Sequence, residues 1–378
     1  MTKTLNEFLE YKTLYYEKID YEVIKKAWKQ LETHITLPFV IHIVGTNGKG
    51  STGRFLASFL NQLNKKVLHY TSPHIIEFNE RIWINGSDSS SDKLDSAHLK
   101  LQKLLDNKIL EKLTYFEYTT LLALILSDGL DYLVLEAGLG GEFDATNVVK
   151  NNLSIFTPIG LDHQEFLGDT IKDIATTKLK SCDSKFIISQ QVSDEVYQVK
   201  DDVLKDKIEI KLENIKHNIS NNLPKYLEQN LNTALNVIRY LQLSINDLYI
   251  PHLFGRFEKI APNITIDVGH NTLASKAIVE ELIKSDKKIS LIYNSYKNKD
   301  YKNILTMLKP IVKSIMIIPC NDDRIVNQKT LEEIINSLAI TVKAYDIMKL
   351  DDKEDYLVFG SFIVVEQFLK GYKQYEKR

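Results

Sequence analysis

Short apolar runs alternate with longer helical segments along the chain, and this alternation limits the possible folds more than any other feature. Runs rich in β-branched and aromatic residues occupy 39–44, 131–137 and 153–159. Apolar residues recur at helical spacing over 51–63, and YFEYTTLLALIL, residues 115–126, is interpreted as a buried helix. Strands and helices in this order are typical of βαβ units. We therefore predict an α/β fold built on a mostly parallel sheet.

The alternation breaks over residues 241–256, where LQLSINDLYIPHLFGR carries a proline and a glycine but no long period. Beyond this segment the alternation begins again, which predicts a second sheet. The strands expected there are 263–268, 288–293, 313–319, 340–345 and 356–360. We therefore predict two domains, residues 1–245 and a smaller one over 246–378. In the first domain, the polar run 85–95 is interpreted as a loop.

Composition excludes several classes of protein. The 48 basic and 50 acidic residues give a net charge of -2, so there is no electrostatic reason to expect a nucleic-acid partner. Cys182 and Cys320 lie far apart and form no C-x-x-C pair, which disfavours a disulfide framework or a zinc site. The N-terminal residues lack the apolar core of a signal peptide, and no apolar run approaches the roughly 18 residues of a membrane span. We expect a cytoplasmic protein with no membrane partner.

The segment HIVGTNGKGST, residues 42–52, joins a predicted strand to a predicted helix and contains a glycine-rich turn. The common phosphate-binding loop reads G-x-x-x-x-G-K-[ST], whereas Gly50 stands here between Lys49 and Ser51. Backbone N–H groups of such a turn and the helix N-terminus attract an anion, while the lysine reaches the β- and γ-phosphates. The hydroxyl of Ser51 or Thr52 can ligate Mg²⁺. The alternative is a glycine-rich turn that binds nothing. The ATP-binding residues predicted in this loop are Asn47, Gly48, Lys49, Gly50 and Ser51.

Two polar side chains follow the next predicted strands. Glu136 ends the apolar strand 131–137, at the edge where doubly wound sheets place their ligands. A carboxylate there suits Mg²⁺, which prefers oxygen ligands, although an exposed acid at a strand end is the common alternative. His163 follows strand 153–159, and a single histidine is more often structural than a metal ligand.

The loop GTNGKGS resembles that of the Mur ligase superfamily, and GKG followed by a hydroxyl resembles its folylpolyglutamate synthase and dihydrofolate synthase branch. The peptidoglycan branch usually has threonine at the position of Gly50. Further segments resemble family motifs in the same order along nearly the whole chain. They are YTSPHIIEFNERIWING, LTYFEYTTLLALI, LEAGLGGEFDATNVV, GLDHQEFLGDTIKDIATTK, EQNLNTAL, FGRFE and IDVGHN. The resemblance implies an N-terminal P-loop ATPase-like domain with the pteroate or folate site and a smaller C-terminal Rossmann-like α/β domain.

The resemblance also implies the reaction. The enzyme would be an ADP-forming ligase that joins L-glutamate to 7,8-dihydropteroate, and to the terminal carboxylate of reduced folates, through an acyl phosphate. ATP would be the co-substrate, and we expect a monomer. The alternatives are folylpolyglutamate synthase activity alone, a peptidoglycan-precursor ligase, which Gly50 disfavours, or a P-loop regulatory NTPase without ligase activity. The sequence lacks the N-K-x-D segment that would specify guanine.

Site residues follow from the matching motif positions. The resemblance implies two Mg²⁺ sites, the first with Ser51, Ser72 and Glu136 and the second with His163 and a carbamylated Lys178. Lys49, Glu136, His163 and Lys178 would form the catalytic set. Two positions depart from the family, because Thr177 replaces an acid and Glu142 replaces a basic residue.

Further matching positions are assigned to the substrates. Thr114, Phe116 and Asp144 would hold the pterin, since a ring can stack on it and a carboxylate can accept from its amino-pyrimidine edge. Asn232 would contact the adenine. Arg256 would reach the ATP phosphates when the domains close, and Asp267 and His270 would contact the nucleotide. Core packing of Phe116 and a ligand-free polar turn at Asp267, His270 and Asn271 are the alternatives.

Overall fold

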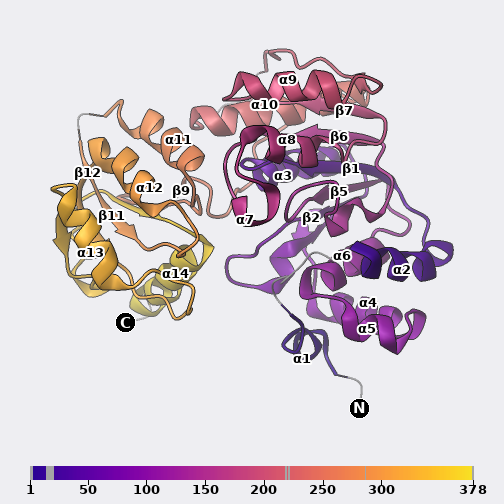
Figure 1. Ribbon diagram of the computed structural model, residues 1–378, viewed down its shortest axis with the longest axis horizontal. Helices are drawn as coiled ribbons and strands as arrows, with labels where there is room; N and C mark the ends of the chain where they lie inside the picture. The colour runs from indigo at the N-terminus through magenta and orange to yellow at the C-terminus, as the bar shows by residue number, and fades with distance from the viewer. Residues whose placement is uncertain (1–2, 14–20, 218, 220–221, 286, 377–378) are drawn as a thin grey trace. The chain divides into compact units, whose positions relative to one another are not determined.

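The computed structural model describes residues 3–13, 21–217, 219, 222–285 and 287–376. The chain forms two compact units (Figure 1). The first comprises Met1–Asn222 with Leu227–Pro251, and the second Leu223–Tyr226 with His252–Arg378. Each unit is built on a mostly parallel sheet with helices, so the predicted α/β class is confirmed.

The first unit contains an eight-stranded sheet in the order β4-β3-β2-β5-β1-β6-β7-β8. Along the sheet, the neighbours β2, β5, β1, β6, β7 and β8 pair in parallel. At the other edge β3 and β4 pair antiparallel, β3 with β2 and β4 with β3. Strands buried on both sides read as continuous apolar runs, which explains why β1 and β5 are evident from the sequence. The bounds are β1 Phe39–Val44, β2 Val67–Tyr70, β3 Ile82–Ile84, β4 Ser87–Asp88, β5 Tyr132–Glu136, β6 Leu153–Phe156, β7 Lys185–Ile188 and β8 Ile208–Glu209.

Helices bury the faces of this sheet. α2, α4 and α6 share one apolar core with β2 and β5, while α8 and α9 share another with β6 and β7. α3 contacts β1, β2 and β5 directly. The bounds are α1 Leu5–Leu9, α2 Tyr21–Leu31, α3 Lys49–Gln62, α4 Ser91–Leu104, α5 Asn107–Lys112, α6 Tyr115–Leu126, α7 Gln164–Leu167, α8 Ile171–Leu179, α9 Asp194–Val203 and α10 Lys225–Tyr240. Short 3-10 turns cover Glu32–His34, Phe78–Arg81 and Ala145–Val148.

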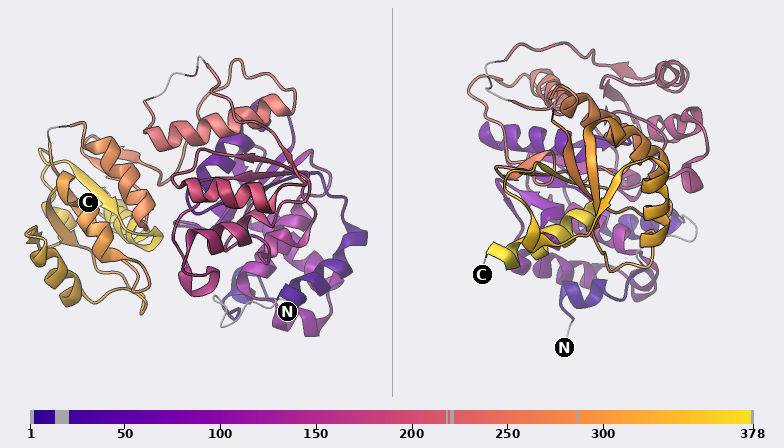
Figure 2. Two further views of the ribbon diagram at one scale, coloured as in Figure 1. Left: turned by 45° about the horizontal axis from the view of Figure 1, so that its top comes forward. Right: turned by 90° about the vertical axis from the view of Figure 1, so that its left-hand side faces the viewer.

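The second unit contains a six-stranded sheet in the order β13-β12-β11-β14-β10-β9, parallel except for β9, and Figure 2 shows it from two sides. α11, α12 and α13 share its main core, and α14 packs on β14. The strands are β9 Glu258–Ala261, β10 Ile264–Ile266, β11 Ile289–Tyr293, β12 Val312–Ile317, β13 Thr341–Lys343 and β14 Tyr356–Phe359. The helices are α11 Thr272–Leu282, α12 Tyr301–Leu308, α13 Gln328–Ser337 and α14 Phe362–Glu376, with 3-10 turns at Lys309–Ile311 and Ile347–Lys349.

Two features differ from the sequence prediction. The polar run 85–95 is not a simple loop, because it contains β4 and the first turn of α4, which the Ser90 hydroxyl caps by accepting from Lys93 N. β9 is a strand that the sequence analysis did not predict. It pairs antiparallel with β10, which follows directly in a hairpin, and it has no apolar period of its own. No helix in the described part of the chain has the length and apolar character needed to cross a bilayer.

Candidate active site

The glycine-rich turn between β1 and α3 has the geometry of an anion-binding loop. α3 begins at Lys49, and Gly48 before it adopts the left-handed conformation with φ of 82°. The N–H groups of Thr46 and Asn47 both donate to the carbonyl of Pro158, at 2.9 and 3.1 Å, and this fixes the loop against the end of β6. The first-turn N–H groups of a helix lack intrahelical acceptors, so the turn presents donors to an anion.

Two side chains of this loop fold back on its own carbonyls. The Lys49 ammonium donates to Thr46 O at 3.2 Å, and the Ser51 hydroxyl donates to Gly48 O at 3.2 Å. Ser51 is only 3% exposed, so its hydroxyl is held inside the turn rather than in solvent. Lys49 is partly exposed and provides a cation at the start of the helix. The predicted Lys49 and Ser51 therefore share one turn.

Parallel register brings Glu136 to the same edge of the sheet. β1 pairs with β5 so that Ile43 lies opposite Glu136, and the N–H of Ala137 donates to Ile43 O at 2.9 Å. Glu136 is 4% exposed, and the Thr71 hydroxyl from the end of β2 donates to its carboxylate. The sequence did not single out Thr71, although it lies in the quoted TSPH segment.

Lys178 is buried at the same edge and bridges two loops. α8, which carries it, begins with a capping box between Thr170 and Asp173. The ammonium donates to Gly45 O at 3.0 Å and to Gly140 O at 3.5 Å. Burial, together with the charge of Lys49, lowers the pKa of Lys178 to about 7 against the opposing effect of Asp162 and Asp144. The downward shift favours the neutral amine at this position.

His163 sits in a tight turn before α7. Its φ is 52°, in the left-handed region, and its backbone N–H donates to Asp162 Oδ1 at 2.9 Å. Its Nε2 lies 3.9 Å from the same carboxylate oxygen. A left-handed backbone is uncommon for a residue other than glycine. The predicted role as a metal ligand stays a prediction.

The donor set fits Mg²⁺ at the first predicted site. Ser51 and Glu136 supply a hydroxyl and a carboxylate held at one sheet edge, and Ser72 follows Thr71 in the adjoining loop. Oxygen donors of this kind suit a hard cation. No group of three histidine, cysteine, aspartate or glutamate side chains among the described residues forms a metal cluster. The second predicted site, with His163 and a carbamylated Lys178, stays a prediction.

The three residues assigned to the pterin all have local structural contacts. Thr114 caps α6 through a capping box with Glu117. The Phe116 ring lies 5.8 Å from the Tyr70 ring and against Gly138, where an added Cβ would approach within 2.6 Å. Packing of Phe116 therefore already accounts for that glycine. A binding role for Thr114 and Phe116 stays a prediction.

Asp144 accepts three hydrogen bonds from its own loop. Its carboxylate accepts from Leu139 N at 2.7 Å, from Thr146 N at 2.9 Å and from the Thr146 hydroxyl at 2.5 Å. Burial raises the pKa of Asp144, and these hydrogen bonds oppose the shift. The contacts give Asp144 a structural role that the sequence did not predict. Its predicted contact with the pterin amino groups stays a prediction.

The second unit brings Arg256, Asp267 and His270 together. Asp267 is 4% exposed and accepts from Phe257 N at 2.9 Å, Gly269 N at 2.7 Å and the Tyr226 hydroxyl at 2.8 Å. The Arg256 guanidinium lies over the Phe362 ring at 5.1 Å, and the His270 ring lies 6.3 Å from the same ring. Asp267 thus holds the backbone next to Arg256, through Phe257, and the backbone next to His270, through Gly269.

Of two asparagines on α10, the one that contacts the phosphate loop is not the one that the sequence analysis selected. The Asn232 amide accepts from Ile215 N and donates to Glu213 O, both at 3.0 Å, so it holds the segment before the helix. Asn230, which the sequence analysis did not select, donates from Nδ2 to Ser51 Oγ at 2.8 Å. Both lie in EQNLNTAL, and no local pattern distinguishes which of them faces the loop.

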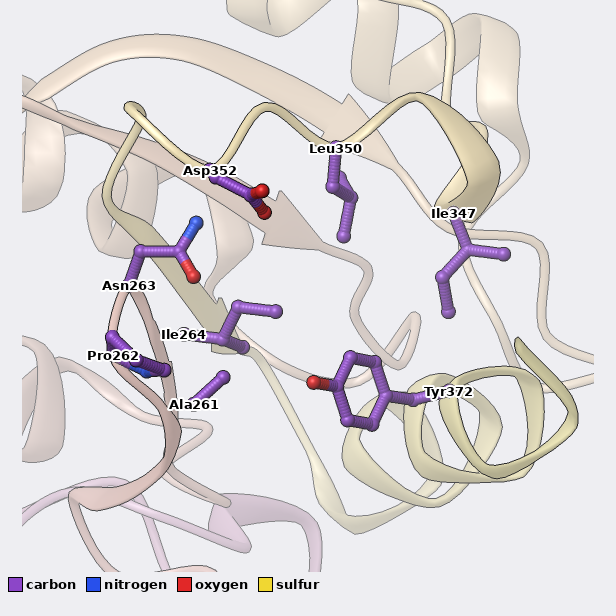
Figure 3. A pocket seen from close by; sticks show the side chains of 8 residues that line it. All are labelled: Ala261, Pro262, Asn263, Ile264, Ile347, Leu350, Asp352 and Tyr372. Carbon is purple, nitrogen blue, oxygen red and sulfur yellow. The ribbon is translucent and has the colours of Figure 1, made fainter. Parts of the chain in front are cut away.

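A cavity in the second unit lies away from the predicted site residues (Figure 3). It measures about 150 Å³, and the Tyr372 ring points into it from α14 opposite the β9–β10 turn. Its lining residues are Ala261, Pro262, Asn263, Ile264, Ile347, Leu350, Asp352 and Tyr372. None of the predicted site residues lines this cavity, so it is not the candidate active site.

Comparison with known proteins identifies the family. The model of the Mur ligase middle domain matches residues 43–242, which include the glycine-rich loop, Glu136, Lys178 and α10. A dihydrofolate synthase/folylpolyglutamate synthase of Haemophilus influenzae is 31% identical over 428 residues, covering 97% of each chain. The chain belongs to the Mur ligase family. The resemblance to its dihydrofolate synthase and folylpolyglutamate synthase branch is confirmed.

Solved structures of Mur ligase relatives agree with the fold. The folylpolyglutamate synthetase of Helicobacter pylori is 38% identical, covers 98% of each chain and superposes with a TM-score of 0.76. The Escherichia coli FolC structure in complex with ADP is 25% identical, with a TM-score of 0.84 and coverage of 99% of this chain and 97% of its own. Both alignments span the two units.

The two departures from the Mur ligase motifs lie in contact. The N–H of Glu142 donates to Thr177 O at 2.8 Å, and the Glu142 carboxylate lies 3.4 Å from the Lys180 ammonium. The reversed charge at Glu142 is therefore balanced by a lysine two residues beyond Lys178. The backbone contact also fixes the turn of α8 that carries Lys178.

Proposed function

We propose that this chain is an ATP-dependent, ADP-forming ligase that joins L-glutamate to 7,8-dihydropteroate and to the terminal carboxylate of reduced folates. The observation that carries the proposal is the buried Glu136 carboxylate at the sheet edge where Lys49 begins α3. This arrangement occurs in a chain matched over 97% of its length by a dihydrofolate synthase/folylpolyglutamate synthase. A carboxylate and a lysine at one phosphate loop are the parts that phosphoryl transfer requires.

The first half-reaction transfers a phosphoryl group. A carboxylate oxygen of the acceptor attacks the γ-phosphorus of ATP, the bond to the β,γ-bridging oxygen breaks, and an acyl phosphate and ADP form. Catalysis of this step is mainly positioning and charge neutralisation. The loop Asn47, Gly48, Lys49, Gly50 and Ser51 supplies backbone donors and one ammonium for the phosphates.

The second half-reaction forms the amide. The neutral amino nitrogen of L-glutamate attacks the acyl carbon, a tetrahedral intermediate collapses, and phosphate leaves with the electron pair of the broken C–O bond. The nitrogen loses a proton as the amide forms. Water must be kept from the acyl phosphate, because hydrolysis would waste ATP.

The metal sites are part of the proposal. Mg²⁺ supplies charge neutralisation and polarisation of phosphoryl oxygens when it is bound. Ser51, Ser72 and Glu136 would hold one ion, and their oxygen donors support this assignment. His163 and carbamylated Lys178 would hold a second. A carbamate forms when a neutral amine attacks CO₂ and loses a proton, and the burial that lowers the pKa of Lys178 to about 7 supplies that neutral amine.

The substrate contacts are assigned on the same basis. Asn232 would contact the adenine, and Arg256, Asp267 and His270 the nucleotide. The clustering of the last three within the second unit supports a shared role. Thr114, Phe116 and Asp144 would hold the pterin, and Phe116 presents an aromatic ring from the first turn of α6 beside Gly138.

The decisive experiment measures phosphate release with each acceptor. Purified protein is mixed with ATP, Mg²⁺ and L-glutamate, and with either 7,8-dihydropteroate or a tetrahydrofolate. We expect phosphate release and glutamylated product with both acceptors, and neither without an acceptor. Product from the tetrahydrofolate alone would restrict the activity to folylpolyglutamate synthase.

Two outcomes would overturn the proposal. ATP hydrolysis that proceeds equally without acceptor and glutamate would favour a regulatory NTPase. Product formation at the wild-type rate by Glu136→Gln would remove the role of the carboxylate. Asp131→Asn provides a matched control, because Asp131 precedes the same strand at its opposite end.

A further inference from the structure

One side chain from α10 contacts both functional parts of the phosphate loop. Asn230 is 3% exposed, and its Nδ2 donates to Ser51 Oγ at 2.8 Å across a sequence separation of 179 residues. Its Oδ1 lies so close to Gly48 that an ideal Cβ there would approach it within 2.7 Å. The same amide therefore faces the left-handed turn and the hydroxyl of the loop.

These contacts determine the direction of the Ser51 hydroxyl. A hydroxyl has one hydrogen to donate and two lone pairs to accept with. The hydrogen is directed to Gly48 O at 3.2 Å, and one lone pair accepts from Asn230. One lone pair then remains for an electropositive ligand. Without Asn230 the hydroxyl could rotate and present its hydrogen to a cation instead.

We propose that Asn230 is a positioning residue that orients the Ser51 hydroxyl and supports the Gly48 turn for binding a magnesium–nucleotide complex. The inference rests on the proposed function, because it assumes that this loop binds ATP. It assigns to Asn230 a role distinct from that of Asn232, whose amide is engaged by Glu213 and Ile215.

Asn236 on the same helix provides a matched control. It is also 3% exposed, and its Nδ2 donates to Glu213 O and Asn232 O, both at 2.8 Å, while its Oδ1 accepts from Glu213 N at 3.0 Å. Its replacement removes a buried amide of the same helix without touching the phosphate loop. A general loss of α10 stability would therefore appear in both variants, but a loss of hydroxyl orientation in only one.

The test measures ADP binding by calorimetry with and without Mg²⁺. We expect Asn230→Ala to weaken Mg²⁺-dependent ADP binding about tenfold, the usual effect of losing one buried hydrogen bond to a ligand-binding group. Metal-free ADP binding should fall less than binding of the magnesium complex, because it depends on the Gly48 turn but not on the oriented hydroxyl. Asn230→Asp, which keeps the shape but replaces the donor with an acceptor, should weaken the magnesium complex at least as much. Asn236→Ala should lower the unfolding temperature and leave both affinities unchanged.

A double-substitution cycle isolates the Ser51 contact. In a Ser51→Ala background, Asn230→Ala should cause no further loss of magnesium dependence, because the oriented hydroxyl is already gone. Wild-type affinity in both Asn230 variants, an equal loss in Asn236→Ala, or a full effect in the Ser51→Ala background would each overturn the inference. If the wild-type chain binds ADP and Mg²⁺ but makes no glutamylated product, the proposed function is contradicted. The binding measurements would still test the role of Asn230, because they do not depend on product formation.

Discussion

The Lys178 ammonium lies 3.0 Å from the carbonyl oxygen of Gly45, so α8 is hydrogen-bonded directly to the first glycine of the phosphate loop. The two residues are 133 positions apart in the sequence. A fully charged lysine would be costly at this depth, and burial accordingly lowers the pKa of Lys178 to about 7. The position therefore combines a buried amine of lowered pKa with a direct hydrogen bond to the phosphate loop.

Replacement of Lys178 tests the carbamate. We expect Lys178→Met and Lys178→Arg to lose roughly a hundredfold or more in ligase turnover, because neither side chain can become a carbamate that binds metal. Wild-type protein incubated with ¹³C-bicarbonate should show a carbamate carbon signal by NMR, and Lys178→Arg should not. Normal turnover by Lys178→Met would remove the carbamate from the mechanism.

Arg256→Ala should lower turnover far more than it lowers stability. The guanidinium is partly exposed and contacts the Phe362 ring at 5.1 Å, which contributes about 0.5–1 kcal/mol to folding. If the arginine neutralises phosphate charge, turnover should fall at least tenfold. The measurement compares kcat with the unfolding temperature.

Arg324→Ala is the control for Arg256. Arg324 lies over the Tyr296 ring at 4.7 Å in the same unit and pairs with Asp322. Its replacement should lower stability by a similar amount and leave kcat intact. Equal turnover in the wild type and Arg256→Ala would exclude a phosphate contact for Arg256.

Gly53 and His69 form a tight contact behind the phosphate loop. An ideal Cβ at Gly53 would lie 2.3 Å from His69 Nε2, and His69 is fully buried on β2. We expect Gly53→Ala to destabilise the protein by about 1–3 kcal/mol, because a packed core does not accept the added methyl group. Urea unfolding measures the change. The double variant Gly53→Ala/His69→Ala should be more stable than the sum of the single effects; simple additivity would show that the clash is absent.

Buried His42 should make stability depend on pH. It is 1% exposed on β1, and burial lowers its pKa to about 3. Between pH 6.5 and about 3 the unfolded chain binds a proton here that the folded chain does not. Stability due to this residue therefore falls as pH decreases through that window, with a limiting slope of about 1.4 kcal/mol per pH unit. Above pH 6.5 both states are neutral and the contribution is constant.

A variant separates His42 from other titrating groups. His42→Gln keeps a polar partner for the Thr146 hydroxyl, which lies 2.8 Å from His42 Nε2. Urea unfolding at pH 7, 6 and 5 should show a smaller loss of stability on acidification in the variant than in the wild type. Parallel pH profiles would mean that His42 is protonated within the folded protein.

Much of the fold and part of the site could be predicted from the sequence because their signals are local. Buried parallel strands are continuous apolar runs, and a glycine-rich turn between such a strand and an amphipathic helix is visible without any partner. The position of Glu136 at a strand end followed in the same way. β9 escaped prediction because its stability comes from pairing with β10 rather than from an apolar period of its own.

The sequence by itself determined the α/β class, the loop of Lys49 and Ser51, and the family motifs that contain the other candidate residues. Only the tertiary structure decided which side chains meet. Asn230 rather than Asn232 contacts Ser51, Thr71 contacts Glu136, and Lys178 contacts Gly45. The physical reason is that periodicity and turn chemistry act over a few residues, whereas these contacts depend on how strand register and helix packing align segments far apart in the chain.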